Sequence, residues 1–210
     1  MLAACGVPVV PKRLVQDAEE AAAVAEGFGF PVVLKAESAA LPHKTEAGVV
    51  RLNLRDAAEV RAAHAAILAN AARAAPGAAI DGVLVQPMLP AGLEVMLGAH
   101  RDPLFGPVVA VGLGGVLVEL LTDVAVAPAP PQARRMLQGL RGARLFQGFR
   151  GSAPVELDRL AEIVCRIGEL VTRHPHIREL DINPLICGTG GIMAVDGLIA
   201  LSAPGEGEEE

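Results

Sequence analysis

Residues 32–50 read VVLKAESAALPHKTEAGVV and contain two of the three lysines of this chain. An apolar run ends in Lys35, a short loop carries His43 and Lys44, and Gly48 leads into a second apolar run. The chain also has fifteen arginines, so lysine is not its usual surface cation. A lysine ammonium is a compact charge with three donors, which suits a phosphate oxygen. The stretch predicts two strands and leaves two interpretations of the loop, a phosphate-handling site or a solvated turn.

The composition is that of an acidic, globular protein. The chain has 210 residues, of which 52% are hydrophobic and 20% are charged, and its formal net charge is −6. Aromatic residues make up only 2%, with no Trp or Tyr, so stacking on nucleic-acid bases is a poor prospect. An acidic chain without a basic run is also a poor nonspecific binder of nucleic acid. We therefore expect no nucleic-acid partner.

The cysteines and the most apolar segment indicate a cytoplasmic protein without a membrane partner. The three cysteines are odd in number and lack metal-ligand spacing, which fits thiols in a reducing compartment. Residues 108–121 are the most apolar run, but glycines and Glu119 interrupt it, and it is too short to span a bilayer. The N-terminus has no signal-peptide pattern.

The first 88 residues are predicted to form one α+β lobe, with elements in the order helix, strand, strand, helix, strand. Asp56 is a plausible N-cap for the second helix, with a glutamate three residues later. In the second strand, alternation places Val50, Leu52 and Leu54 on one face. The expected elements are residues 17–26, 31–35, 48–54, 56–73 and 82–88.

Residues 89–203 are predicted to form a second α+β lobe. Its best helix carries an apolar stripe at helical spacing, and two short strands joined by a glycine-rich turn read as a hairpin. The acidic tail at 204–210 is expected to be disordered. The expected elements are strands at 93–98 and 108–111, helices at 132–139 and 154–173, and strands at 179–185 and 191–196.

Asp181, Asn183 and Asp196 form a candidate metal site. In the segment LDINPL, alternation puts Asp181 and Asn183 on one face of a strand, and Asp196 ends the next strand. If the two strands pair as a hairpin, a carboxylate and an amide oxygen converge at its open end. Such oxygens, completed by phosphates, suit Mg²⁺. The alternative is structural, an Asx-type turn and a loop cap.

Glu94 and the glycines at 112–115 are weaker signals. The sequence GLGG after an aliphatic strand permits close backbone approach to a ligand, but it lacks the dinucleotide fingerprint. Glu94 lies alone in an apolar strand. It either accepts hydrogen bonds from ribose hydroxyls or simply points outward from a half-exposed strand.

Taken in order, these segments resemble a known family. The matching stretches are GFPVVLKAES, LPHKTEAGVVRLNL, GVLVQPM, GLEVMLGAHRDPLFGPVVAVGLGGVLVELLTDV, FQGFRG and ELDINPL, which cover most of residues 1–203. They resemble the ATP-grasp β-subunit or domain of NDP-forming acyl-CoA synthetases, the superfamily of ADP-forming acetyl-CoA synthetase and succinyl-CoA synthetase. The resemblance implies an α+β ATP-grasp fold of two lobes with ATP or ADP between them.

The resemblance also implies roles for single residues. Lys35 corresponds to the phosphate-binding lysine, and Glu94 to the acid that binds ribose. Gln86, Pro87 and Met88 correspond to the hinge whose backbone meets adenine.

Further residues correspond to metal ligands and to a catalytic residue. Asn183 and Asp196 match the Mg²⁺ ligands, and His43 matches a histidine that relays phosphate in some members. A neutral imidazole is a competent nucleophile near its ordinary pKa of about 6.5. One departure is Val49, which stands where the family usually has a second loop glycine.

The family implies an enzyme subunit that needs a partner. The chain lacks a CoA-binding domain and a second phosphohistidine segment, so we expect a CoA-binding α-subunit in a hetero-oligomer. One alternative is a nucleotide-binding regulatory module, as in protein acetyltransferases with a synthetase-like region, and Val49 gives it some weight. A stand-alone ATP-grasp ligase is a third possibility, against which the HKT loop argues.

Overall fold

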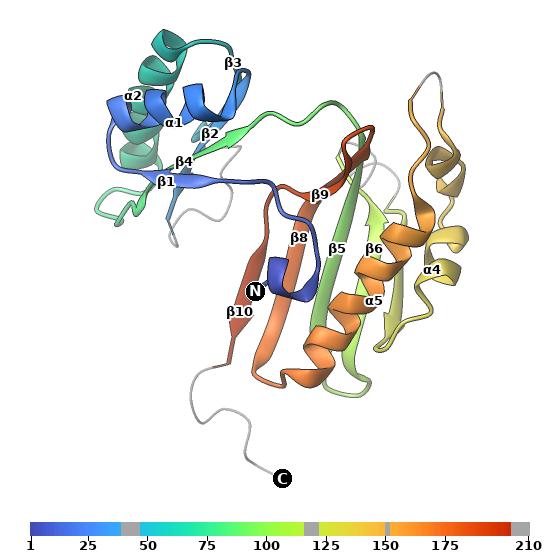
Figure 1. The fold of residues 1–210 in the computed structure, drawn as a ribbon. Helices are drawn as coiled ribbons and strands as arrows, with labels where there is room; N and C mark the ends of the chain where they lie inside the picture. The colour runs from blue at the N-terminus through green and yellow to red at the C-terminus, as the bar shows by residue number, and fades with distance from the viewer. Residues whose placement is uncertain (39–46, 116–121, 150–151, 203–210) are drawn as a thin grey trace. The chain divides into compact units, whose positions relative to one another are not determined.

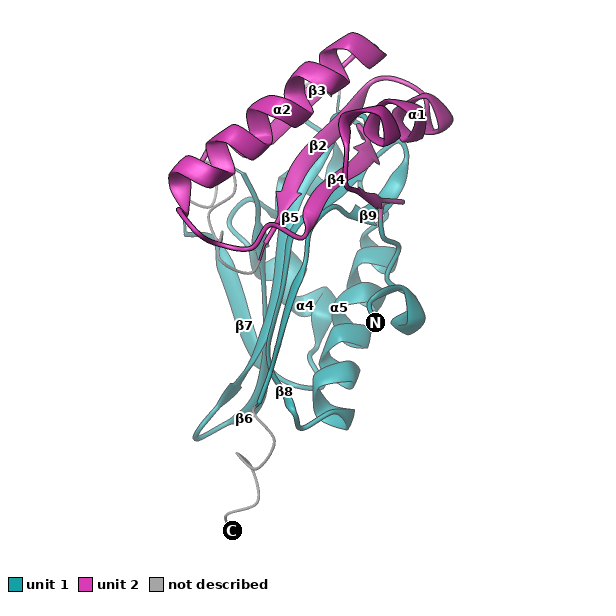
Figure 2. Cartoon of the chain, turned by 90° about the vertical axis from the view of Figure 1, so that its left-hand side faces the viewer, with its two compact units in different colours: residues 1–9, 90–210 teal, residues 10–89 magenta. Residues whose placement is uncertain are grey.

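The computed structural model describes residues 1–38, 47–115, 122–149 and 152–202, and all structural statements refer to these (Figure 1). The chain divides into two compact units, residues 10–89 and residues 1–9 with 90–210 (Figure 2). Each unit has its own hydrophobic core. No helix in the described part of the chain is long and apolar enough to cross a membrane.

The smaller unit is a four-stranded antiparallel sheet covered on one face by two helices (Figure 1). The strand order is β1-β4-β2-β3. The core is aliphatic and rich in alanine, which lets α1, α2 and the sheet approach closely. The elements are β1 Arg13–Val15, α1 Ala18–Phe28, β2 Val32–Glu37, β3 Val50–Leu54, α2 Ala57–Ala74 and β4 Gly82–Pro87.

Side-chain caps fix where both helices of this unit begin. The Asp17 carboxylate accepts hydrogen bonds from the N–H groups of Glu19 and Glu20 at 2.9 and 2.8 Å. Asp56 accepts one from the N–H of Glu59 at 2.8 Å. Each cap satisfies donors that have no partner within the helix. The cap predicted at Asp56 is confirmed.

The prediction that Val50, Leu52 and Leu54 share one face of β3 is wrong. Leu54 is buried, but Leu52 is 59% exposed. Leu54 pairs with Val32 whereas Arg51 pairs with Leu34, so β3 has one more residue than β2 in this interval. The extra residue is a bulge, and it reverses the direction of the side chains that precede it.

The larger unit is a second antiparallel sheet, of order β10-β8-β5-β6-β7, with β9 pairing to β8. Two α-helices and a short 3-10 segment cover one face, and their apolar side chains form the larger core with that face (Figure 1). The elements are η1 Ala3–Cys5, β5 Leu93–Asp102, β6 Gly106–Leu113, β7 Val124–Pro128, α4 Ala133–Gly139, η2 Ala143–Gln147, α5 Leu157–Arg173, β8 Ile177–Gly188, β9 Gly191–Ala194 and β10 Leu198–Leu201.

The first nine residues belong to the larger unit, which corrects the predicted lobe of residues 1–88. Val7 lies in the core of the larger unit, and Val9 forms a parallel bridge with Ala194. The N–H of Ala194 donates to the carbonyl of Pro8 at 2.8 Å. These contacts join the two ends of the chain, and local patterns do not reveal such long-range pairing. The second boundary lies between residues 89 and 90.

Arg101 of β5 caps the C-terminal end of α5. Its guanidinium donates to the carbonyls of Val171, His174 and Ile177. A cation at this end complements the helix dipole and satisfies carbonyls that have no partner within the helix. Arg101 therefore holds β5, α5 and the start of β8 together.

Candidate functional site

Lys35 and Gln86 lie on the same face of the smaller sheet, opposite the helices. Their neighbours Leu34 and Val85 point into the core, so alternation turns Lys35 and Gln86 to the other face. In the register, Val33 pairs with Gln86 and Lys35 pairs with Leu84. The two polar side chains are therefore diagonal neighbours on adjacent strands.

Both side chains are almost completely buried, with exposed fractions of 4% for Lys35 and 2% for Gln86. Lysine is rarely buried to this degree. The Oε1 atom of Gln86 is buried without a hydrogen-bond partner among the described residues. An unsatisfied buried acceptor costs about 1–3 kcal/mol, so it marks a position where a ligand donor is favoured.

The predicted hinge starts at Gln86 and continues through Pro87 and Met88. Pro87 ends β4, and Met88 is partly exposed. The N–H of Met88 donates to the carbonyl of Pro31 at 2.9 Å, so this donor is used by the neighbouring chain segment. The Gln86 side chain is therefore the polar group of the hinge that lacks a partner within the described residues.

The hairpin predicted for the metal site is present in the larger unit. Leu185 of β8 pairs with Ala194 of β9, and the N–H of Val195 donates to the carbonyl of Pro184 at 3.0 Å. Continuing this register brings Asp196 opposite Asn183, as the sequence predicted. The backbone thus places one carboxylate and one amide on adjacent segments at the open end of the hairpin.

Asp181 adds a second carboxylate to this region. Burial raises the pKa of Asp181, and the charges of Glu179 and Asp196 raise it further. Asp181 is half-buried and lies beside Gly98 of β5. A cation bound beside Asp181 would relieve this repulsion.

The residues present fit a magnesium ion that is also held by phosphates. The described part of the chain has no group of three or more His, Cys, Asp or Glu side chains arranged to hold a metal ion by themselves. Magnesium is commonly bound through one or two carboxylates together with substrate phosphates. Asn183 and Asp196 match this incomplete ligand set.

Glu94 explains why the chain needs glycines at 114 and 115. The N–H of Gly114 donates to the carbonyl of Glu94 at 2.7 Å. A Cβ atom at Gly114 would lie 2.9 Å from the Cβ of Glu94, and one at Gly115 would lie 2.9 Å from its Oε2. The sequence suggested that these glycines permit a ligand to approach the backbone, and the structure shows Glu94 in close contact with both.

Glu94 lies on the outer face of the larger sheet, since its neighbour Val95 points into the core. It pairs with Ile186, three residues from Asn183 along β8. At a rise of about 3.3 Å per residue, Glu94 and Asn183 are separated by roughly 10 Å along the strand direction. The larger unit therefore carries Glu94 and Asn183 on the outer face of its sheet, with Asp196 opposite Asn183.

His43 lies outside the described residues, as do Lys44 and Glu119. Sequence reasoning also missed one buried carboxylate, Asp123, which accepts hydrogen bonds from the N–H groups of Arg141 and Gly142, both at 2.8 Å. Its only sequence signal was an isolated acid before the apolar run of β7.

The class of protein is defined by comparison with known families. A family model described as the ATP-grasp domain matches residues 1–201. The chain belongs to the ATP-grasp family. Within that family it belongs with the β subunits of ADP-forming acetate–CoA ligases. It is 39% identical to the β subunit of acetate–CoA ligase [ADP-forming] I from Pyrococcus furiosus, over 93% of this chain and 86% of the relative.

Other relatives carry the same region inside a longer chain. This chain is 40% identical to a trans-feruloyl-CoA synthase from an unknown prokaryotic organism, over 97% of its own length but only 29% of the relative. This chain therefore corresponds to less than a third of that relative.

Solved structures of similar proteins have the same fold. The acetyl-coenzyme A synthetase 1 of Ca. Korarchaeum cryptofilum, in complex with coenzyme A and Ca-AMPCP, matches with a TM-score of 0.92 at 41% identity, over 96% of this chain and 89% of that chain. A second structure of that protein contains Mg-AMPPCP and a phosphohistidine segment that points towards the nucleotide-binding site. It matches with a TM-score of 0.81 at 38% identity, over 96% and 88% of the two chains.

Proposed function

We propose that this chain is the nucleotide-binding subunit of an ADP-forming acyl-CoA synthetase. It would transfer a phosphoryl group between ADP or ATP and a phosphohistidine on a CoA-binding partner subunit. The observation that carries the proposal is the buried pair of Lys35 and Gln86, with the acceptor of Gln86 unpartnered within the described residues. The similarity to a β subunit over nearly the whole chain supports it.

Each candidate residue has a physical task in this proposal. Lys35 binds a phosphate oxygen, because an ammonium on a buried strand gives a strong, charge-assisted hydrogen bond. The Oε1 of Gln86 accepts from a donor on the base, and Glu94 accepts from ribose hydroxyls. Magnesium, held by Asn183, Asp196 and phosphates, neutralises charge on the transferring group.

His43 is proposed as a phosphate relay. A neutral imidazole nitrogen forms a bond to phosphorus while the bond to the leaving group breaks, and the histidine then passes the phosphoryl group on. The Korarchaeum structure with a phosphohistidine segment turned towards its nucleotide site supports such a transfer in this family.

The regulatory-module alternative loses its one supporting feature. Val49 is fully buried in the core of the smaller unit, and its carbonyl accepts a hydrogen bond from the N–H of Ala36 at 3.0 Å. Gly48, the residue before Val49, has a φ of 65°, a positive value that glycine adopts without strain. Val49 therefore serves packing and is no sign that nucleotide binding is lost.

The test is synthesis of ATP by the reconstituted enzyme. The chain is combined with the CoA-binding subunit encoded by the same organism, acetyl-CoA, phosphate and Mg-ADP. We expect ATP to form, and no ATP without the partner. Nucleotide binding without ATP formation, over a panel of acyl-CoA substrates, would support the regulatory module instead.

We also infer a cytoplasmic location, which the three free cysteines support.

A further inference from the structure

One buried carboxylate of the larger unit has no part in the proposed chemistry. Asp123 stands directly before β7 and is only 5% exposed. One of its oxygens accepts a hydrogen bond from the N–H of Arg141 and the other from the N–H of Gly142, both at 2.8 Å. Aspartate is rarely buried to this degree unless it is paired. The two bonds hold the connection between α4 and η2 against the start of β7.

The connection that Asp123 holds packs on the end of β6. A Cβ atom at Gly142 would lie 2.3 Å from Cδ1 of Leu113, so the backbone at residue 142 packs directly against that side chain. The N–H of Leu113 also donates to the backbone carbonyl of Asp123 at 3.4 Å. A Cβ at Gly112 would lie 2.7 Å from the same carbonyl oxygen. Asp123, the connection and the end of β6 therefore form one tightly packed cluster.

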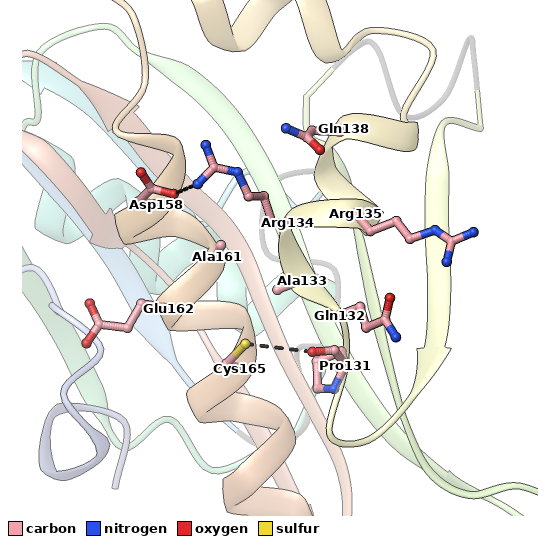
Figure 3. A pocket seen from close by; sticks show the side chains of 10 residues that line it. All are labelled: Pro131, Gln132, Ala133, Arg134, Arg135, Gln138, Asp158, Ala161, Glu162 and Cys165. Carbon is pink, nitrogen blue, oxygen red and sulfur yellow. Dashed lines mark hydrogen bonds and ion pairs between the residues drawn. The ribbon is translucent and has the colours of Figure 1, made fainter.

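The helix that leads into this connection is itself fixed. Arg134 of α4 forms an ion pair with Asp158 of α5 (Figure 3). Just before α4, the carbonyl of Pro131 accepts a hydrogen bond from the thiol of Cys165 at 3.7 Å (Figure 3). The residues of α4 that pack into the larger core are Ala133, Met136 and Leu137. Asp123 is therefore bonded to a backbone that is already supported, so its bonds can restrain the end of β6.

The end of β6 in turn restrains Glu94. Leu113 pairs with Val95, and the N–H of Gly114 donates to the carbonyl of Glu94 at 2.7 Å. The Cα atoms of Gly114 and Gly115 lie against the Glu94 side chain, since an added Cβ at either would come within 2.9 Å of it. The backbone at residues 114 and 115 therefore limits the rotamers that are open to Glu94.

Asp123 and Glu94 lie on opposite faces of the larger sheet. Asp123 bonds to the connection on the helix side, whereas Glu94 lies on the outer face because its neighbour Val95 points into the core. Glu94 is exposed, and its carboxylate forms no hydrogen bond or ion pair with the described residues. Such a side chain loses rotamer entropy on binding a ligand, unless the backbone beside it already restricts it.

We propose that Asp123 is a positioning residue for Glu94, the ribose-binding acid of the proposed function. Asp123 holds the end of β6 from the helix side, and the backbone at residues 114 and 115 passes that restraint to Glu94 on the outer face. The ribose hydroxyls then meet an acceptor whose direction is already set. This rests on the proposed function, because the restraint matters only if Glu94 binds ribose. The alternative is an Asp123 that stabilises the larger unit and does nothing for ribose recognition.

The test compares Mg-ADP with Mg-2′,3′-dideoxy-ADP, which lacks both ribose hydroxyls, by calorimetric titration into the full chain. The ratio of the two affinities measures recognition of the hydroxyls. It should be at least about tenfold in the wild type and fall in Glu94→Gln, because hydrogen bonds to a charged acceptor are strong. Asp123→Asn should lower the ratio at least about threefold, with dideoxy-ADP binding nearly unchanged. The double variant should show no reduction beyond that of Glu94→Gln.

Asp102→Asn is the matched control. Asp102 is also a carboxylate that accepts two backbone N–H bonds, but at the opposite end of the β5–β6 pair. Its replacement should lower the free energy of unfolding and leave the affinity ratio unchanged.

Gly142→Ala is a second variant that disturbs the same link without removing a charge. The φ of Gly142 is −88°, which suits alanine, and the added methyl group would displace Leu113. It should also lower the affinity ratio. If Asp123→Asn does not fold, an unchanged ratio in Gly142→Ala overturns the inference in its place.

The outcomes separate this inference from the proposed function. If Asp123→Asn folds and keeps the wild-type ratio, the inference is overturned and the proposed function stands. An equal reduction by Asp102→Asn also overturns it, because any loss of stability would then have the same effect. If the wild type binds Mg-ADP and the dideoxy analogue equally, Glu94 does not bind ribose and the inference fails, while nucleotide binding stands. Absence of Mg-ADP binding by the wild type overturns the proposed function, and the inference with it.

Discussion

Lys35 and Gln86 lie diagonally across the β2–β4 pair on one face of the smaller sheet, both buried. The unsatisfied Gln86 acceptor is costly for a free protein. A bound nucleotide would remove that cost, since its base donates to the amide while a phosphate accepts from the lysine beside it. The first two predictions test these two contacts separately.

Replacing Lys35 with Met should lower Mg-ADP affinity by at least about tenfold, because a charge-assisted hydrogen bond to phosphate is lost. Met keeps the length of the side chain, so packing changes little. Isothermal titration calorimetry measures the affinity. Lys12→Met, at an exposed lysine of the same unit, should bind as the wild type does. If Lys35→Met and Lys12→Met bind Mg-ADP with equal affinity, Lys35 is not part of the nucleotide site.

Replacing Gln86 with Met should change stability and binding in opposite directions. The free energy of unfolding should rise by about 1 kcal/mol, because an unsatisfied buried acceptor is removed, while Mg-ADP affinity should fall. Urea denaturation and calorimetry measure the two quantities. Gln138→Met, at an exposed glutamine of α4, serves as the control. A variant that is less stable than the wild type would mean that Oε1 already has a partner.

From the residues alone, Lys35 could be read as a phosphate contact or as a simple strand end, and the family resemblance favoured the first. Gln86 received a role from the resemblance only, and nothing in the sequence indicated that it is buried on the face away from the helices. Burial on that face depends on the whole fold, whereas the helix starts at Asp17 and Asp56 are local and could be read directly.

Other features were missed because they depend on pairing between distant segments. Leu52 is exposed because β3 bulges against β2, and residues 1–9 join the larger unit because Val9 pairs with Ala194.

The short strands β7 and β10 were missed for a different reason. Each has only four or five residues, which carry little periodic signal.

Asp181→Asn should stabilise the nucleotide-free chain at neutral pH. The pKa of Asp181 is raised in the folded state, so its ionised form opposes folding once the pH exceeds the ordinary value of 3.8. The advantage of the variant should shrink as the pH falls towards 3.8 and vanish below that value, where the carboxyl is protonated in both states. Denaturation at about pH 7 and at about pH 3 measures it.

Asp102→Asn is the matched control of opposite sign. Asp102 accepts hydrogen bonds from the N–H groups of Leu104 and Phe105, which lower its pKa. Its ionised form therefore favours folding at neutral pH, and Asn should destabilise the chain there. If both variants change stability in the same direction, the electrostatic account of Asp181 is wrong.

His64 should make the smaller unit sensitive to acid. It is buried on α2, its Nε2 has no hydrogen-bond partner among the described residues, and burial lowers its pKa from 6.5. The unfolded chain therefore binds a proton before the folded chain does, and stability is lost as the pH falls below about 6.5. His64→Leu should flatten the stability profile between pH 7.5 and 5. An unchanged slope would contradict this assignment.

The central claim is that this chain itself forms a magnesium-dependent nucleotide site. The most direct measurement is a calorimetric titration of ADP into the isolated wild-type chain, with excess Mg²⁺ and again with EDTA. The account predicts one site per chain in Mg²⁺ and markedly weaker binding in EDTA, because Asn183 and Asp196 act through the ion. Absence of binding in Mg²⁺, or equal affinity with and without the ion, would contradict it.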